Sequence, residues 1–255
     1  METLIQIVTS VKSIITDRSM AENVKEKGTA DFVTAVDISV QNKIRQQLAK
    51  QFPEAGFLGE EDHSKQFDYQ KKVFVLDPVD GTTNLIHNYQ MSAVSLALVE
   101  NGTVTKGIVY NPFSEELFCA QRGKGAFLNN SPIHVSSAQT LSDGLIAIGT
   151  SPYEKERTDN LFLLFKNIFL KAQDIRRSGS AALDLCYVAA GRIDGYFEQN
   201  LKPWDFAAGS LILQEAGGKI TDFSGKKITI FSNCDILAAT NGCHNEILKE
   251  IATIY

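Results

Sequence analysis

The chain reads VFVLDPVDGTTN at residues 73–84. Four apolar residues, mostly β-branched or aromatic, open this stretch, and such a run predicts a strand buried in the interior. The strand is expected to end at Asp77, because Pro78 cannot donate a hydrogen bond to a neighbouring strand and biases the residue before it toward an extended conformation. The fold is therefore expected to be organised around one buried strand that ends in a carboxylate.

An acidic turn follows this strand. Asp77 and Asp80 are three residues apart, Asp80-Gly81 indicates a turn, and Thr82 and Thr83 are candidates to cap a helix. Two close carboxylates repel each other unless a cation or a proton separates them, and oxygen ligands suit Mg²⁺ or Ca²⁺. The N–H groups at a helix start also suit an anion such as phosphate. Taken alone, these residues are equally consistent with an acidic turn that only caps a helix.

Composition narrows the class of protein. The 255 residues suit one large domain or two closely joined halves, and a hydrophobic content of 44% is ample for a core. The net charge of −5 and the lack of a basic run argue against a nucleic-acid partner. No apolar stretch is long enough to span a membrane, and the start of the chain does not resemble a signal peptide. Cysteines without a C-x-x-C pair predict reduced thiols in a cytoplasmic protein.

The first fifty residues predict two helices and a strand. Apolar residues recur at helical spacing over residues 1–20, and residues 25–28 are expected to end that helix. Residues 32–36 predict a short strand. Asp37 then precedes a second amphipathic helix, which Pro53 terminates, so Asp37 is a candidate N-cap.

A glycine and three acids come next, in Gly59-Glu60-Glu61-Asp62. Such a run is typical of a solvated loop. The preceding Phe57-Leu58, however, predicts a short buried strand that would hold Glu60 near the interior. The polar residues 62–72 are expected to form a lid or a linker.

The remainder of the first half predicts an antiparallel meander. Its expected strands cover residues 93–99, 105–110, 117–120 and 125–128, with turns at 101–102 and 129–132. The polar residues 136–142 mark a boundary between an N-terminal half, 1–140, and a C-terminal half, 141–255.

The second half alternates strands with helices. Its expected strands are residues 145–148, 195–198, 220–221, 229–231 and 236–239, and its expected helices begin near residues 161, 181, 204 and 245. This alternation predicts a mixed sheet covered by helices, an α/β (α+β mixed) fold.

Three motifs now point in one direction. They are G-E-E at 59–61, D-P-V-D-G-T-T-N at 77–84, and W-D-F-A-A-G at 204–209 with E-A-G-G after it. Together they resemble the inositol monophosphatase family of Mg²⁺-dependent, lithium-sensitive phosphatases, in order and over nearly the whole chain. The resemblance implies a layered αβαβα sandwich acting as one compact catalytic unit, commonly as a homodimer.

The resemblance also implies roles for individual residues. Glu60, Asp77 and the carbonyl of Val79 would hold a first Mg²⁺, Asp77, Asp80 and Asp205 a second, and a third ion would sit near Glu60. The expected catalytic residues are Thr82, Asp37 and Glu60, with Thr82 and Asp37 activating a water on the first metal. The expected substrate-binding residues are Asp80, Gly81, Thr82, Gly179, Ser180, Ala181, Glu198 and Asp205.

Some of these assignments have a simpler alternative. Gly179-Ser180-Ala181 is equally consistent with a close-packed helix start. Arg176 and Arg177 could attract a phosphate, although surface arginines are common.

The predicted activity is hydrolysis of a small phosphorylated polyol such as myo-inositol 1-phosphate. Relatives of the family cleave fructose 1,6-bisphosphate, the 2′-phosphate of NADP or 3′-phosphoadenosine nucleotides, and the sequence leaves these alternatives open. A phosphatase that forms an aspartyl-phosphate is a further alternative, but that group uses acids at i and i+2, whereas Asp77 and Asp80 are at i and i+3. A non-catalytic binding protein is the third, and the clustered acids argue against it.

Overall fold

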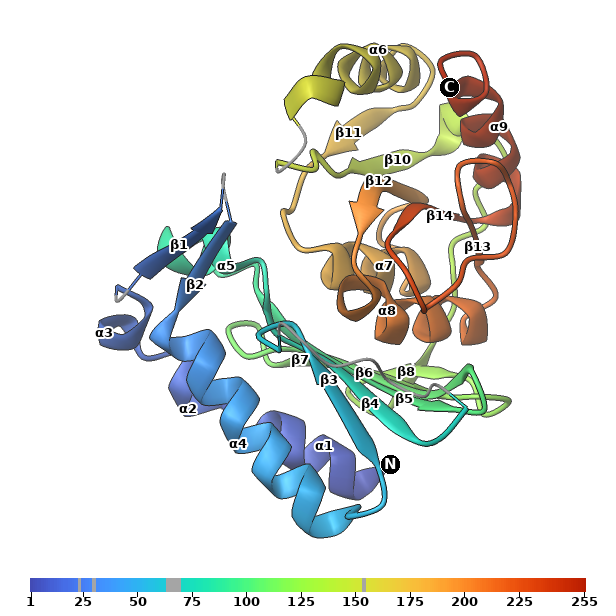
Figure 1. Ribbon diagram of the computed structural model, residues 1–255. Coiled ribbons are helices and arrows are strands. Elements are labelled where there is room, and N and C mark those ends of the chain that lie inside the picture. The colour runs from blue at the N-terminus through green and yellow to red at the C-terminus, as the bar shows by residue number, and fades with distance from the viewer. Residues whose placement is uncertain (23, 29–30, 63–69, 153–154) are drawn as a thin grey trace.

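The computed structural model describes residues 1–22, 24–28, 31–62, 70–152 and 155–255. Helices and sheets alternate through the molecule in the order α, β, α, β, α (Figure 1). The predicted layered αβαβα architecture is therefore confirmed.

The first layer consists of helices at the N-terminus. They are α1 (Glu2–Thr9), α2 (Lys12–Ile15), α3 (Arg18–Ala21) and α4 (Ala35–Gln51). The prediction of one continuous helix over residues 1–20 is wrong. The hydroxyls of Thr9 and Ser10 bond back to carbonyls of α1, and Asp17 caps α3 by accepting from the Ser19 N–H. Such side-chain bonds compete with the helix and break it into three pieces.

A two-stranded ribbon follows, formed by β1 (Val24–Gly28) and β2 (Asp31–Thr34) in antiparallel pairing. Residues 25–28, expected to end a helix, therefore belong to a strand, because β2 supplies hydrogen-bond partners that local sequence does not reveal. The strand expected at 32–36 ends at Thr34, which caps α4 instead.

The second layer is a seven-stranded sheet whose spatial order follows the chain. Its strands are β3 (Gly56–Gly59), β4 (Val73–Asp80), β5 (Ala93–Glu100), β6 (Thr103–Asn111), β7 (Glu116–Gln121), β8 (Ala126–Leu128) and β9 (Ser131–Ile133). β3 is parallel to β4, and the other neighbours are antiparallel, as the predicted meander requires. Ser131 and Pro132, expected in a turn, lie in β9, where an edge position tolerates proline.

Strand β4, second from one edge of this sheet, is buried along its whole length. It runs past the predicted end at Asp77 to Asp80, but its pairing with β5 shifts register between these two residues. Gly81 follows with a φ of +90° and is the N-cap of α5 (Thr82–Ile86). Thr82 and Thr83 are thus inside the helix and are not its caps, which leaves the Thr82 hydroxyl available for other partners.

The fourth layer is a five-stranded sheet in the order β11-β10-β12-β14-β13. Its strands are β10 (Leu145–Ile148), β11 (Asp174–Arg176), β12 (Gly195–Leu201), β13 (Lys219–Thr221) and β14 (Cys234–Ala239). The sheet is mixed, because β10 is parallel to both its neighbours and β14 is antiparallel to both of its own. Residues 229–231, predicted as a strand, do not form one, and Ile230 and Phe231 lie in a bend.

Helices cover both faces of this sheet (Figure 1). They are α6 (Thr158–Phe169), α7 (Ala181–Ala189), α8 (Pro203–Glu215) and α9 (Asn241–Ile251), with short 3-10 turns at Leu141–Asp143 and Lys155–Arg157. α9 begins four residues earlier than predicted, because Thr240 caps it by accepting from the Cys243 N–H. Within the described ranges, no helix combines the length and apolarity needed to cross a membrane.

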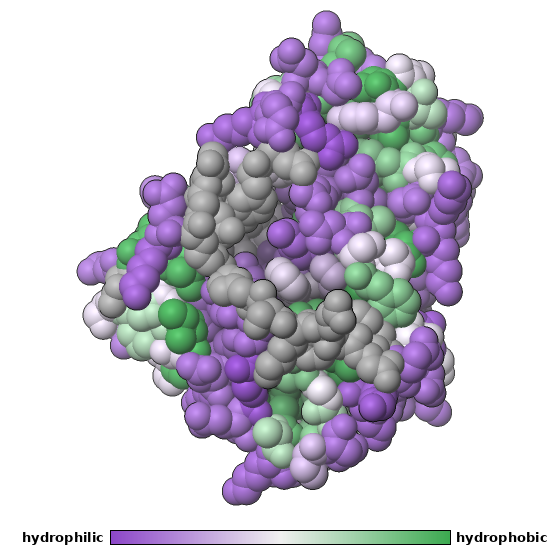
Figure 2. Space-filling view, in the orientation of Figure 1, coloured by the Kyte–Doolittle hydropathy of each residue, from purple (hydrophilic) through white to green (hydrophobic). Residues whose placement is uncertain are grey.

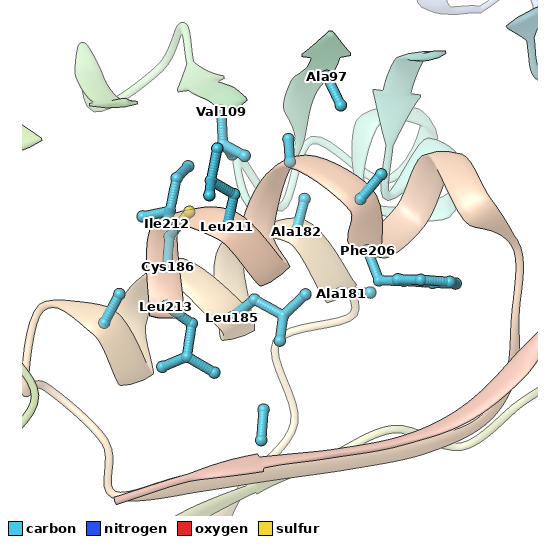
Figure 3. Packing of buried hydrophobic residues seen from close by; sticks show 14 of the residues in the cluster. Ala97, Val109, Ala181, Ala182, Leu185, Cys186, Phe206, Leu211, Ile212 and Leu213 are labelled. Carbon is cyan, nitrogen blue, oxygen red and sulfur yellow. The ribbon is translucent and has the colours of Figure 1, made fainter. Parts of the chain in front are cut away.

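Small residues let α7 and α8 pack closely between the two sheets (Figure 3). A Cβ atom on Gly209 would lie 2.8 Å from the side chain of Leu185 in α7. On the other side of α8, a Cβ on Gly107 would lie 2.7 Å from the Ala208 carbonyl. This close packing fixes the start of α8, and with it Asp205, against the seven-stranded sheet.

Candidate active site

One cleft gathers residues from both halves of the chain. The face in Figure 2 is hollowed near its centre, and the residues along the right side of the hollow are mostly hydrophilic. The predicted site residues that line the cleft are Glu60, Asp77, Val79, Asp80, Gly81, Thr82, Gly179, Ala181, Glu198 and Asp205. Asp37 and Ser180 lie behind this lining, in hydrogen bonds to Thr82 and Asp80. The structure thus brings all the predicted site residues together.

Glu60 and Asp77 meet where β3 and β4 end. The Glu60 N–H donates to the Leu76 carbonyl at 3.1 Å, which holds Glu60 beside β4. Asp77 is buried, and its Oδ1 accepts from the Val79 N–H at 2.9 Å. Burial raises the pKa of Asp77 well above its usual range, and the charges of Glu60 and Asp80 raise this pKa further.

Asp80 connects the two halves. Its Oδ2 accepts from the Ser180 hydroxyl at 2.5 Å and from the Ala182 N–H at 2.7 Å, both at the start of α7. Burial raises the pKa of Asp80 to about 6, although these two donors oppose the rise. One oxygen of Asp80 is therefore committed to α7.

Asp205 reaches the cleft from α8, far away in sequence. Its Oδ2 accepts from the Lys202 N–H at 2.7 Å, and the Ser95 hydroxyl donates to the Trp204 carbonyl at 3.0 Å. The second bond fastens the start of α8 to β5 and places Asp205 beside Asp80. Burial raises the pKa of Asp205 well above its usual range, with a further contribution from the charge of Asp80.

Asp37 has a more specific position than the predicted N-cap. The N-cap of α4 is Thr34, and Asp37 is the third residue of the helix, where its Oδ2 accepts from the backbone and the hydroxyl of Thr34. Its Oδ1 accepts from the Thr82 hydroxyl at 3.0 Å. Thr82 also contacts the Val79 carbonyl at 3.1 Å. The structure thus pairs Thr82 with Asp37, as the resemblance implies.

Glu198, in β12, lines the cleft together with Arg177 and Asp184, and these three residues form what is called the far wall below. Its Oε2 accepts from the Tyr196 hydroxyl at 2.6 Å and its Oε1 from the Ser151 N–H at 3.0 Å. The carboxylate lies directly over Gly149, where any Cβ atom would overlap it. Glu198 is therefore held in one orientation by neighbours on both sides.

Two further charged residues, Arg177 and Asp184, belong to this wall. Arg177 lines the cleft, whereas Arg176 is exposed and pairs with Asp174 away from it. Asp184 also lines the cleft, and its Oδ2 accepts from the Ser178 hydroxyl at 2.7 Å. Sequence reasoning missed Asp184. The available signal was a single acid in the otherwise apolar helix AALDLCYVA.

Comparison with known proteins gives this arrangement a family. A profile of the inositol monophosphatase family matches residues 1–254. The chain belongs to the inositol monophosphatase family. The resemblance seen in the sequence motifs is thereby confirmed.

Individual relatives carry two different names. An inositol-1-monophosphatase of Rhizobium meliloti is 40% identical over 84% of this chain and 81% of its own length. A protein named Nus factor SuhB of Escherichia coli is 42% identical over 80% of this chain and 77% of its own. The crystal structure of the extragenic suppressor protein suhB of Bartonella henselae covers 98% of this chain and 97% of its own, with 37% identity and a TM-score of 0.93. Relatives with either name are therefore about equally similar in sequence to this chain.

The acids of this family member suit a hard cation. Among the residues that the structure describes, no three His, Cys, Asp or Glu side chains stand close enough to hold a metal ion as they are. Burial raises the pKa values of Asp77, Asp80 and Asp205, and neighbouring carboxylates raise all three further. Carboxylates this close repel one another unless a cation or a proton separates them. Oxygen-only ligands favour Mg²⁺ over zinc. Because every candidate ligand atom is an oxygen, the donor set fits such an ion.

Proposed function

We propose that the protein is a Mg²⁺-dependent phosphomonoesterase that hydrolyses a small phosphorylated polyol such as myo-inositol 1-phosphate. The observation that carries this proposal is the convergence of carboxylates from both halves on one cleft, beside a threonine hydrogen-bonded to a buried aspartate. Membership of the inositol monophosphatase family supports the same activity.

The carboxylates would hold the metal ions. Glu60, Asp77 and the Val79 carbonyl form one candidate set, and Asp77, Asp80 and Asp205 form a second that shares Asp77. When bound, Mg²⁺ would supply positive charge that stabilises the phosphate oxygens and lowers the pKa of water. Oδ1 of Asp80 and Oδ1 of Asp205 are suited to this role. Ser180 and Ala182 donate to Oδ2 of Asp80, and the Lys202 N–H donates to Oδ2 of Asp205, which leaves Oδ1 of each carboxylate for the ion.

Thr82 and Asp37 would orient the attacking water. Both groups that contact the Thr82 hydroxyl, Oδ1 of Asp37 and the Val79 carbonyl, are acceptors. The hydroxyl proton is therefore directed inward, which leaves the lone pairs of the Thr82 oxygen to accept a hydrogen bond from the cleft. Thr34 fixes Asp37 from behind. The pair thus forms a positioned acceptor for a proton of the water.

The far wall favours a neutral, hydroxyl-rich substrate body. Arg177 is the one cation among the described residues that line the cleft, and its charge acts on the nearby carboxylates of Asp184 and Glu198. One cation facing two acids gives a second phosphate little attraction. Hydroxyl groups, in contrast, can donate hydrogen bonds to these carboxylates. This charge balance supports a polyol monophosphate over a bisphosphate.

A substrate panel with Mg²⁺ tests the proposal. Phosphate release would be measured from myo-inositol 1-phosphate, fructose 1,6-bisphosphate, NADP and 3′-phosphoadenosine 5′-phosphate. The highest kcat/KM is expected for the inositol phosphate. A preference for the bisphosphate or a nucleotide would overturn the substrate assignment, and no release from any of them would overturn the reaction class.

Two further features belong to the proposal. We propose that the halves 1–140 and 141–255 act as one catalytic unit, since each supplies carboxylates to the cleft. We also propose that the protein forms a homodimer, that it acts in the cytoplasm, and that it has no nucleic-acid partner. Light scattering on the purified protein tests the dimer, and a monomeric mass would contradict it.

The relatives named Nus factor SuhB give a second candidate, a role in transcription. The support for this second candidate is the 42% identity of the Escherichia coli relative over 80% of this chain. An Asp205→Asn variant separates the two functions. A transcriptional role that is independent of catalysis is expected to survive this substitution, whereas phosphatase activity is not.

A further inference from the structure

We propose that Asp184 is a specificity-determining residue, whose carboxylate accepts a hydrogen bond from a hydroxyl group on the polyol part of the substrate. This inference rests on the proposed phosphatase function and deepens it. Asp184 does not belong to the sets of side chains assigned above to Mg²⁺ or to the water.

Asp184 lies on the far wall of the cleft, near both Glu198 and Asp80. It belongs to the first turn of α7, and the start of that helix is bound to Asp80 through Ser180 and Ala182. Its carboxyl group is close enough to Asp80 and Glu198 for the charge of each to raise its pKa. A substrate whose phosphate lies near Asp80 would place its polyol ring in this region.

One oxygen of Asp184 remains available. Oδ2 accepts from the Ser178 hydroxyl at 2.7 Å, whereas Oδ1 accepts from no group in the described part of the chain. In the described residues, two polar side-chain atoms are both shielded from solvent and without a hydrogen bond, namely Nε2 of Gln199 and Nδ1 of His244. Oδ1 of Asp184 is not one of them, so it must be in contact with solvent, and Asp184 lines the cleft. Asp184 is otherwise buried, with 4% of its surface exposed.

Glu198, the other acid on this wall, has less unused capacity to accept hydrogen bonds than Asp184. Both oxygens of Glu198 already accept hydrogen bonds, from Tyr196 and from Ser151. Of the two acids on the far wall, Asp184 therefore has the greater unused capacity to accept. A substrate hydroxyl would also supply a hydrogen bond that offsets the cost of burying this carboxylate, the main cause of its raised pKa.

The ligand group expected here is a neutral donor. A second phosphate would face the charges of both Asp184 and Glu198, with Arg177 as the only compensating cation that lines the cleft in the described residues. A hydroxyl group carries no charge and supplies the proton that an acceptor needs. The inference therefore points to a polyhydroxylated ring.

The test compares two substrates that differ in their hydroxyl groups. kcat/KM with Mg²⁺ is measured for myo-inositol 1-phosphate and for phenyl phosphate, which has no hydroxyl on its ring. The quantity compared is kcat/KM for myo-inositol 1-phosphate divided by kcat/KM for phenyl phosphate. In Asp184→Ala this ratio is expected to fall at least about tenfold, the effect of losing a hydrogen bond to a charged acceptor. The matched control is Ser178→Ala, which breaks the same interior bond from the other side, and its ratio is expected to stay within about twofold of the wild type.

The outcomes separate the possible failures. An unchanged ratio in Asp184→Ala, or an equal fall in Ser178→Ala, would overturn the role of Asp184 and reduce it to a support for the 178–180 turn. A wild-type protein that releases phosphate from neither substrate would overturn the proposed function itself. Asp184→Leu, which keeps the branched shape of the side chain and has no acceptor, is measured in parallel with circular dichroism. If Asp184→Ala does not fold, the same fall of at least about tenfold is expected in Asp184→Leu, and an unchanged ratio there would overturn the role of Asp184.

Discussion

The hydroxyl of Thr82 donates a hydrogen bond of 3.0 Å to Oδ1 of Asp37, across 45 residues of sequence. The other oxygen of Asp37 is held by the Thr34 N–H at 2.8 Å, inside the capping box of α4. The same carboxylate therefore stabilises a helix start and orients a hydroxyl in the cleft. Its structural and proposed catalytic roles are compatible, because each uses a different oxygen.

The first prediction concerns this pair. Thr82→Ala is expected to lower kcat by at least ~10²-fold, the scale of general acid–base catalysis, while KM changes only a few-fold. This pattern marks an interaction made mainly in the transition state. Steady-state kinetics with saturating Mg²⁺ would measure both constants.

Thr82→Ser is the matched control, since it keeps the hydroxyl and removes only a methyl group. It is expected to retain most of the wild-type kcat. If Thr82→Ala itself kept a kcat close to that of the wild type, the hydroxyl would have no part in the chemistry.

The second prediction concerns Mg²⁺ and Asp205. Mg²⁺ is expected to raise the Tm of the wild type, because a ligand that binds only the folded state stabilises it by about 2.7 kcal/mol at 100 times its Kd. Asp205→Asn is expected to need roughly 10- to 100-fold more Mg²⁺ for the same shift and to lose at least ~10²-fold in kcat/KM. The fold is retained, since the amide oxygen of asparagine can still accept from Lys202.

Thermal melts over a Mg²⁺ titration would measure this effect. Asp159→Asn, a change of the same kind at an exposed position of α6, is the control and is expected to behave as the wild type. Full turnover in the presence of excess chelator would refute the metal requirement.

Much of this site could be predicted from the sequence. The run at residues 73–76 is apolar because β4 is buried on both faces, and a motif of acids directly after a buried strand has few structural uses. The convergence of Asp205 on Asp77, in contrast, followed only from the family resemblance. The physical cause is the tight packing of α8 through Gly107 and Gly209, which no local pattern expresses.

The predictions that failed have two kinds of cause, a local backbone conformation and contacts made only in the folded chain. Thr82 was expected to cap α5, but Gly81 adopts a φ of +90° and takes the cap position. Backbone freedom at that glycine thus decides which hydroxyl faces Asp37. Asp184 was missed because its environment is created by the 178–180 turn and β12, elements that meet α7 only in the folded chain.

The third prediction concerns pH. His244 is fully buried, with Nε2 2.9 Å from the Thr221 hydroxyl, and burial lowers its pKa from 6.5 to about 4. Between these values the unfolded chain binds a proton that the folded protein excludes. Stability is therefore lost as the pH falls from about 6.5 toward 4, by up to roughly 1.4 kcal/mol per pH unit from this residue.

Urea unfolding at pH 6.5, 5.5 and 4.5 would measure this loss. His244→Gln removes the titrating group, so its stability relative to the wild type is expected to improve steadily as the pH falls. The difference between the two proteins cancels the opposite contribution of the cleft acids. The exposed His134→Gln is the control, and a constant difference between His244→Gln and the wild type would contradict the prediction.

The last prediction concerns the nucleophile. A phosphatase that uses an aspartate as nucleophile needs a carboxylate oxygen free to attack phosphorus. Oδ1 of Asp77 accepts from the Val79 N–H, and Oδ2 of Asp80 accepts from Ser180 and from Ala182. These donors withdraw electron density from both carboxylates and fix their orientation, and the remaining oxygens are those proposed to face the metal ions. We therefore expect direct transfer of the phosphoryl group to water, without a phosphorylated protein.

Two measurements decide between these chemistries. Acid quenching during turnover of a phosphorus-labelled substrate is expected to leave the protein unlabelled, and Thr82→Ala should not accumulate label either, because no covalent step precedes the attack of water. A substrate with chiral phosphorus is expected to react with inversion, since a single in-line displacement inverts the centre once. Two successive displacements would restore it. Label on Asp77, or net retention at phosphorus, would place this protein with the phosphatases that form an aspartyl-phosphate and would reassign Thr82 and Asp37 to a purely structural role.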